Sequence, residues 1–251
     1  MSDASTLPAW PYPRWIAHRG AGKLAPENTL AAFRLGAQYG YRMFECDTKL
    51  SADGLPFLLH DSTLERTTNG GGMAGEQDFA QLAQLDAGSW LGRAWAGEPL
   101  ATLENVARFC LANQLHLNIE IKPTPGQEEE TGRVVAEHAE RLWKDAACAP
   151  LLSSFRTESL AGAMAAAPKL PRALLLDSLR EGCFDQAQEL GCVALICRYT
   201  LWDAGLVAQA HALGLRALSY TVNDATAADA LLALGTDGII TDRVDLFSPA
   251  A

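Results

Sequence analysis

Short apolar runs recur along the chain from Arg14 onwards, and a longer amphipathic segment follows nearly every one of them. Runs of four to seven residues rich in aliphatic and aromatic side chains are typical of buried strands. Eight strands are predicted, over 15–18, 42–48, 115–121, 151–155, 172–176, 193–197, 217–221 and 237–241. Helices are predicted after the first seven, over 27–39, 102–113, 132–144, 157–167, 183–190, 203–213 and 225–234.

This alternation of strands and helices predicts an α/β fold with a parallel sheet. Eight strands in 251 residues favour a closed (β/α)8 barrel, the TIM-barrel architecture, as a single domain over residues 1–251. An open, doubly wound sheet is the alternative. The glycine fingerprint of dinucleotide-binding sheets does not follow the first strand, which disfavours that alternative.

Residues 49–101 interrupt the alternation between the second strand and its helix. The turn sequence SADG at 51–54 is followed by LPFLLHD over 55–61, which predicts an extra strand. The remainder, 62–101, is rich in Gly and Trp. We interpret the segment as a small insertion after strand two, over the barrel mouth, because long insertions in compact domains are often functional. A surface loop without a function is the alternative for 62–101.

Charge and composition exclude several classes of partner. The net charge of −10 disfavours nonspecific binding to nucleic acid or to anionic lipid. No run of about 18 apolar residues is present to span a membrane, and the proline-containing first fifteen residues do not resemble a secretory signal. The six cysteines form no CxxC pair, which disfavours a structural zinc site. A cytoplasmic protein without nucleic acid or stable membrane partners is expected, and a homo-oligomer is compatible with the sequence.

Acidic side chains gather in the predicted strands. Glu45 and Asp47 lie two residues apart in the second strand, so both side chains point to the same face. Glu120 and Lys122 form a second same-face pair in the third strand. Because active sites of this barrel lie at the C-terminal ends of its strands, we expect these residues and His18, which ends the first strand, to meet at one rim.

Three crowded carboxylates repel one another and raise each other's pKa values. A divalent cation removes this conflict, so one is predicted between Glu45, Asp47 and Glu120. Oxygen ligands suit Mg²⁺ or Ca²⁺ better than zinc, with Mn²⁺ as a further option. The alternative for Glu45 and Asp47 is a buried network of ion pairs with the nearby cations Arg19, Arg42 and Lys122.

His18 and His60 are the candidate general acid and base, because imidazole titrates near neutral pH. The alternative for each is a structural role in the core or at a cap. Arg19 and Lys122 are predicted to bind phosphate oxygens, with charge balance for the carboxylates as the alternative. Surface or packing roles are expected for the other histidines, His116, His138 and His211.

These residues stand in recognisable motifs: HRG at 18–20 with PENT at 26–29, ExD at 45–47, DGxPxxxHD at 53–61, ExK at 120–122, and YTVN and DGIITDR near the end. Together they resemble the glycerophosphodiester phosphodiesterase family, especially its short bacterial cytoplasmic members, over about residues 14–247. Tyr220 stands where many members carry Trp, so it is expected to line the substrate pocket and to affect the choice of alcohol. Within PENT, Asn28 is expected either to cap the first helix or to face an anion.

The resemblance implies metal-dependent hydrolysis of glycerophosphodiesters to sn-glycerol 3-phosphate and an alcohol. It implies that His18 and His60 are catalytic, that Glu45, Asp47 and Glu120 hold the cation, and that Arg19 and Lys122 bind phosphate. Our hypothesis for the chemistry is attack by the glycerol C2 hydroxyl to form a cyclic phosphate, which water then opens. Direct attack by water is the alternative.

Two other functions compete with this interpretation. A lysophospholipase D-like or phospholipase C-like enzyme would act on a lipid, approached through the apolar residues Trp90, Leu91 and Trp95 of the insertion. The net negative charge argues against an anionic membrane. A catalytically silent binding protein on the same barrel is the second alternative.

Overall fold

Eight parallel strands close into a barrel in the computed structural model, which describes residues 7 and 9–249. The barrel strands are β1 (Trp15–Ala17), β2 (Met43–Leu50), β4 (His116–Ile121), β5 (Leu151–Ser154), β6 (Arg172–Leu176), β7 (Cys192–Arg198), β8 (Arg216–Tyr220) and β9 (Gly238–Thr241). Since β1 pairs with both β2 and β9, the sheet has no break, which confirms the (β/α)8 barrel and excludes the doubly wound alternative. The interpretation of the first fifteen residues falls in part on 1–6 and 8, which lie outside the described residues.

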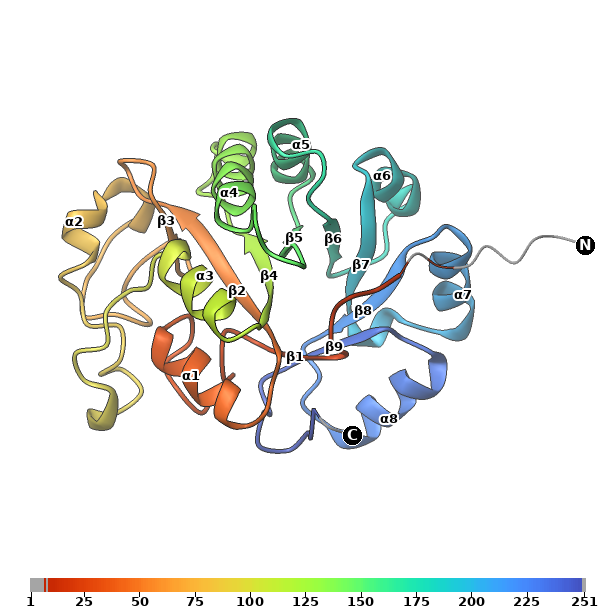
Figure 1. Cartoon of the computed structure of the whole chain (residues 1–251), viewed down its shortest axis with the longest axis horizontal. Coiled ribbons are helices and arrows are strands. Elements are labelled where there is room, and N and C mark those ends of the chain that lie inside the picture. Colours follow the sequence, from red (N-terminus) through yellow and green to blue (C-terminus); the bar gives the residue numbers. More distant parts are fainter. Residues whose placement is uncertain (1–6, 8, 250–251) are drawn as a thin grey trace, which may run out of the picture.

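Helices surround the strands (Figure 1). They are α1 (Leu30–Gln38), α3 (Leu103–Ala112), α4 (Glu128–Leu142), α5 (Thr157–Ala166), α6 (Cys183–Glu189), α7 (Ala204–Ala212) and α8 (Ala225–Leu234). Two helix starts differ from the prediction by more than one residue. The first helix was expected from 27 but begins at Leu30, because the Thr29 hydroxyl caps it by accepting a hydrogen bond from the Ala32 amide. The helix expected from 132 begins at Glu128, whose acidic first turn suits the helix dipole.

Alternation along the strands divides the side chains into two layers. Outward-facing residues such as Phe44 and Cys46 pack against the helices in the larger apolar cluster. Inside the barrel, a second cluster fills the N-terminal part with Tyr12, Ile16, Met43, Leu151, Ala173, Leu175, Ala194, Ile196, Leu218 and Ile240. On β2 the inward-facing series runs from Met43 to Glu45 and Asp47, so the interior changes from apolar to acidic towards the C-terminal ends of the strands.

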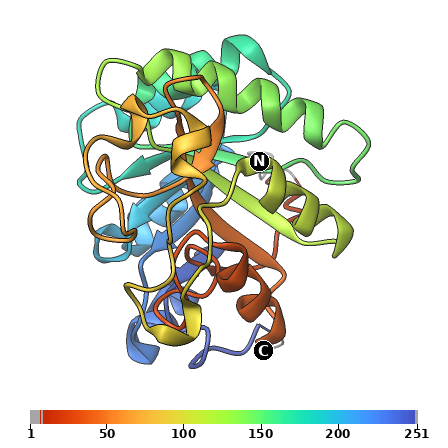
Figure 2. The same ribbon diagram turned by 90° about the vertical axis from the view of Figure 1, so that its left-hand side faces the viewer.

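The insertion after β2 packs on a small core of its own, formed by Phe57, Leu59, Leu64, Ala74, Leu82, Ala87 and Leu100. Its strand β3 (Pro56–Leu58) is shorter than predicted and runs antiparallel to β2. Figure 2 shows the orange and yellow insertion facing the viewer, beside the barrel. Residues 60–62 line the barrel mouth. The insertion also contains three short helices that were not predicted: η1 (Ala74–Glu76), α2 (Phe79–Leu82) and η2 (Arg93–Trp95). A further short helix that was not predicted, η3 (Tyr199–Leu201), follows β7.

Within the described residues, no helix combines the length and the apolar character that crossing a membrane requires. All six cysteines are free thiols, and five of them are buried.

Candidate active site

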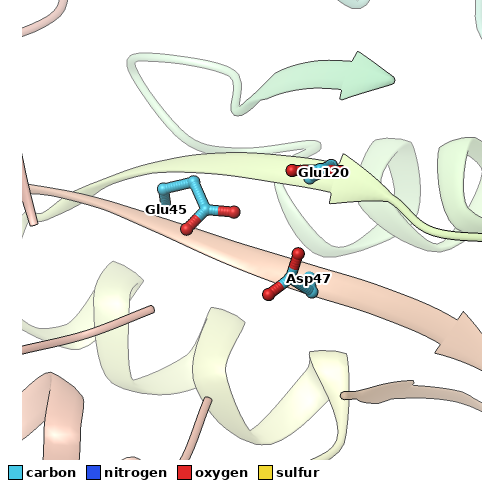
Figure 3. A group of neighbouring side chains, drawn as sticks. All are labelled: Glu45, Asp47 and Glu120. Carbon is cyan, nitrogen blue, oxygen red and sulfur yellow. The ribbon is translucent and has the colours of Figure 1, made fainter. Parts of the chain in front are cut away.

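Three carboxylates converge at the C-terminal end of the barrel interior. The register of β2 and β4 pairs Asp47 with Glu120, and Glu45 lies two residues before Asp47 on the same face of β2. One oxygen from each of Glu45, Asp47 and Glu120 lies within 4.8 Å of the others, and all three residues are buried. Figure 3 shows these carboxylate groups turned toward one another across β2 and β4. The rim predicted from the strand pattern therefore exists.

The acidic cluster has the properties of a cation site. Glu45 Oε1 and Asp47 Oδ1 are buried and accept no hydrogen bond from the described residues. Burial, together with the charge of Asp47, raises the pKa of Glu45 to about 8. Burial likewise raises the pKa of Glu120, and Asp47 adds to the effect. At Asp47, burial is outweighed by the charges of Arg19 and Lys122, which lower the pKa of that carboxyl group. Two buried oxygens without donors, in a cluster where two of three carboxyl groups resist ionisation, fit a hard divalent cation with oxygen ligands.

Two cations flank the carboxylates. Arg19 has a left-handed backbone conformation, with φ of 51°, and its amide donates to Glu45 Oε2. Its guanidinium lies between Glu27 Oε1, at 2.8 Å, and Asp47 Oδ2, at 3.1 Å. Lys122 Nζ lies 3.0 Å from Glu120 Oε1 and 3.9 Å from Asp47 Oδ1. The charge-balancing contacts are thus present, and phosphate binding by Arg19 and Lys122 remains a prediction.

The imidazole of His18 is held by the last motif of the chain. Its Nδ1 lies 2.6 Å from Asp242 Oδ1, and the Asn223 amide donates to the other oxygen of Asp242. Gly22 allows this approach, because a Cβ atom there would lie 2.1 Å from the Asp242 carbonyl oxygen. Burial lowers the pKa of His18, but Glu45 and the hydrogen bond to Asp242 outweigh burial and raise the pKa overall. With a proton on Nδ1, the free nitrogen of the ring is Nε2, 3.7 Å from Glu45 Oε2.

His60 is oriented in the same way by a different carboxylate. Its Nδ1 lies 2.6 Å from Asp61 Oδ1, and the Lys122 ammonium lies 3.1 Å from Nε2. Arg66 donates to both oxygens of Asp61 and both oxygens of Glu27, so it clamps the insertion to the loop before α1. Burial lowers the pKa of His60, and the charges of Arg19 and Lys122 lower it further, so the pKa is lowered overall although Asp47 and the hydrogen bond to Asp61 oppose this.

Both imidazoles line one cavity of about 170 Å³ with the carboxylates Glu45 and Glu120. Tyr220 also lines it, as predicted from its place in the YTVN motif. The Tyr220 hydroxyl donates to the Leu176 carbonyl, and its ring meets the Phe155 ring edge-on, with centroids 5.7 Å apart. The cavity therefore combines an aromatic pair with the acids and bases of the site.

Several residues of the site were missed at the level of sequence. Asp242 and Asn223 lie in the closing motifs, Asp61 follows His60 directly, and Arg66 lies five residues further on. The HD and TDR sequences were visible signals, but no pattern indicated which histidine each aspartate would hold.

Asn28 does not cap the first helix, and its facing a substrate anion stays a prediction. Thr29 caps α1, and the Asn28 side chain donates to Asp47 Oδ2 and accepts from the Asp47 amide. The other histidines lie away from the cluster: His116 packs edge-on against Tyr12, and His211 pairs with Asp237.

Comparison with known proteins gives one consistent result. Residues 18–246 match the model of the glycerophosphoryl diester phosphodiesterase family. A glycerophosphodiester phosphodiesterase of Caldanaerobacter subterraneus is 33% identical over 233 residues, which cover 90% of this chain and 93% of that protein. A glycerophosphodiester phosphodiesterase of Bacillus subtilis is 29% identical, over 92% of this chain and 84% of that protein.

Solved structures agree. An Oleispira antarctica phosphodiesterase in complex with the product sn-glycerol-3-phosphate superimposes with a TM-score of 0.88 at 33% identity, over 95% of this chain and 97% of that one. A glycerophosphodiester phosphodiesterase from Agrobacterium tumefaciens gives a TM-score of 0.76 at 26% identity, over 95% and 100% of the two chains.

Proposed function

The chain belongs to the glycerophosphoryl diester phosphodiesterase family and is a phosphoric diester hydrolase, and from this premise we propose that its active site uses a divalent cation and two histidines. In this proposal Glu45, Asp47 and Glu120 hold the cation, and Arg19 and Lys122 bind the phosphate. The products are sn-glycerol 3-phosphate, the ligand of the O. antarctica relative, and an alcohol.

One observation carries the proposal: three buried carboxylates converge beside a cavity that two of them, Glu45 and Glu120, line together with both imidazoles. One oxygen of Glu45 and one of Asp47 accept no hydrogen bond from the described residues. Each imidazole has its Nδ1 fixed by a carboxylate at 2.6 Å, which leaves Nε2 as the nitrogen that exchanges a proton. In His60 this Nε2 lies 3.1 Å from the Lys122 ammonium, which the substrate displaces in this proposal. A stability role alone would not require this arrangement, because buried carboxylates without hydrogen bonds are costly.

The side chains divide the reaction between them. When bound, the cation would act as a Lewis acid on the substrate oxygens. One histidine accepts the proton of the glycerol C2 hydroxyl as that oxygen attacks phosphorus, and the other donates a proton to the departing alcohol. Asp242 and Asp61 stabilise whichever imidazole becomes charged. Arg19 and Lys122 balance the charge on the phosphate oxygens in the transition state. Water then opens the cyclic phosphate with the two histidines in reversed roles.

The C2 hydroxyl gives the most direct test of this chemistry. A glycerophosphodiester whose C2 hydroxyl is replaced by hydrogen should release no alcohol, whereas the parent diester should release sn-glycerol 3-phosphate. Both compounds are compared in a coupled assay, with a chelator as the blank. Hydrolysis of the deoxy compound at a comparable rate would show that water attacks directly.

The raised pKa of Glu45 links cation binding to pH. Its pKa in the cation-free protein is about 8, against an ordinary value of 4.5. Between these values the folded chain holds a proton that the unfolded chain has lost, so the stability of the cation-free protein falls as pH rises through this window. The cation must displace that proton, so its affinity should rise by up to about tenfold per pH unit below 8.

Thermal unfolding at pH 6 and pH 8, with and without Mg²⁺, measures this linkage. We expect the cation to raise Tm more at pH 8 than at pH 6. The Glu45→Gln variant is the matched control, because it has no proton to displace and should lose the difference. Equal stabilisation of the unmodified protein at both pH values would contradict the linkage.

The lipid-cleaving alternative gains no support from the insertion. Among its three apolar candidates only Trp90 is exposed, at 39%, while Trp95 packs against the main core. The other large exposed apolar residues of the described chain, Tyr39, Leu179 and Leu246, belong to separate segments.

A further inference from the structure

A second, larger cavity of about 610 Å³ opens directly from the catalytic cavity. The two cavities share five lining residues: His60, Glu120, Lys122, Phe155 and Leu175. They therefore meet at Lys122, one of the two residues proposed to bind the phosphate. If the glycerol phosphate occupies the inner cavity, the departing alcohol must extend into the outer one. The following inference therefore rests on the proposed function and concerns which alcohol the outer cavity accepts.

The wall of the outer cavity is cationic beyond the shared residues. It adds Lys49 from β2, Arg156 from the start of α5, and Arg180 from the segment between β6 and α6. None of these three forms an ion pair within the part of the chain that the structure describes. Lys49 is only 2% exposed, and its ammonium donates to the Lys122 carbonyl oxygen at 3.2 Å, not to a carboxylate. This positive wall stands out in a chain with a net charge of −10.

The acids of the outer cavity do not cancel this charge. Of the three carboxylates that line it, Asp61 is already held by His60 and by the Arg66 guanidinium. Glu120 is held by the Lys122 ammonium. Asp177 is exposed to solvent and accepts a hydrogen bond from the Ser178 hydroxyl. An anion entering the cavity would therefore meet three cations without carboxylate partners.

A quaternary ammonium would find little to bind. Recognition of such cations requires aromatic faces. The described wall of the outer cavity provides one aromatic ring, Phe155, and the Lys122 ammonium already lies 5.8 Å from its centroid.

We propose that the outer cavity is a subsite for the leaving alcohol that selects alcohols bearing an anionic group, such as a second phosphate, over cationic ones. Lys49 from β2 and Arg180 from the segment between β6 and α6 are its specificity-determining residues. The anionic group of the leaving alcohol is attracted to these two side chains, which strengthens substrate binding. The bonds that form and break at phosphorus stay the same.

Three substrates with leaving groups of different charge test the subsite: glycerophosphocholine, glycerophosphoglycerol, and bis(glycerophospho)glycerol. On the unmodified enzyme at low salt, kcat/KM should increase in that order, by about tenfold between the first and the last, since an ion pair with the exposed Arg180 contributes up to about fivefold and the buried Lys49 adds to it. High salt should reduce the spread. Equal values, or a preference for choline, would overturn the proposal.

Substitutions of single cations test which residues of the outer cavity produce this selectivity for charge. Arg180→Gln and Lys49→Gln should each lower the ratio of kcat/KM for bis(glycerophospho)glycerol over glycerophosphoglycerol by about two- to fivefold. Lys169→Gln removes the same charge from an exposed position before β6, at the opposite end of the barrel, and should leave the ratio unchanged. An unchanged ratio in Arg180→Gln, whose exposed side chain is not needed for folding, would contradict the assignment. If none of the three substrates is cleaved, the proposed function itself is overturned. If they are cleaved at rates that do not follow the charge of the leaving alcohol, only the subsite is overturned.

Discussion

Replacing His60 by alanine is expected to lower kcat/KM by roughly a thousandfold, within the range of about 10²–10⁴ that general acid–base catalysis contributes. His60 lines the catalytic cavity, and its Nδ1 is fixed by Asp61 so that Nε2 can exchange a proton. His18→Ala should have an effect of similar size, because Asp242 orients His18 in the same way. Both are measured as release of sn-glycerol 3-phosphate from glycerophosphoglycerol.

The same variants should separate catalysis from cation binding. His60 supplies no atom to the carboxylate cluster, so His60→Ala should still bind Mn²⁺ in a calorimetric titration. His138→Ala is the matched control: this imidazole lies on α4, beside Arg141, and its loss should change kcat/KM by less than about twofold. An active His60→Ala enzyme would remove the acid–base pair from the mechanism.

Removal of the cation is expected to abolish turnover. Treatment with EDTA should lower kcat by at least about a thousandfold, because charge stabilisation at phosphorus and polarisation of the substrate depend on the cation. Adding back Mg²⁺, Mn²⁺ or Ca²⁺ in turn should restore activity and show which ion serves best. Full activity in the chelator, after dialysis, would contradict a metal-dependent reaction.

The Glu45→Gln variant tests whether the carboxylates are the reason for that dependence. The glutamine carbonyl can still accept the Arg19 amide hydrogen bond that Glu45 accepts, so the fold should persist. Cation affinity should fall by about 10–100-fold, and activity at limiting cation should fall with it. The cation-free variant should be at least as stable as the parent, since one acid of the cluster has been neutralised. A marked loss of stability with unchanged cation affinity would indicate a purely structural role.

Much of this site follows from local sequence. The period of two on β2 places Glu45 and Asp47 on one face, and the rule that barrel sites lie at the C-terminal ends of strands brings Glu120 beside them. The closed barrel likewise follows from eight alternating units. These features depend on short-range periodicity, which a single sequence displays directly.

The parts that could not be predicted depend on contacts between distant segments. Asp242 holds His18 from 224 residues away, and Arg66 joins Glu27 to Asp61 across the insertion and the first loop. Asn28 was weighed as a cap because of its type, yet Thr29 takes that position and leaves Asn28 free to hold Asp47. The outer cavity is assembled from five segments, so its positive charge is invisible in the net charge of the chain.

Diffraction from crystals grown with Mn²⁺, recorded at the manganese edge, tests the central claim most directly. The account predicts one anomalous peak at the C-terminal end of the barrel, with an oxygen of each of Glu45, Asp47 and Glu120 within about 2.0–2.6 Å of it. A peak bound by other residues, or bound by only one of these carboxylates in an active enzyme, would contradict it.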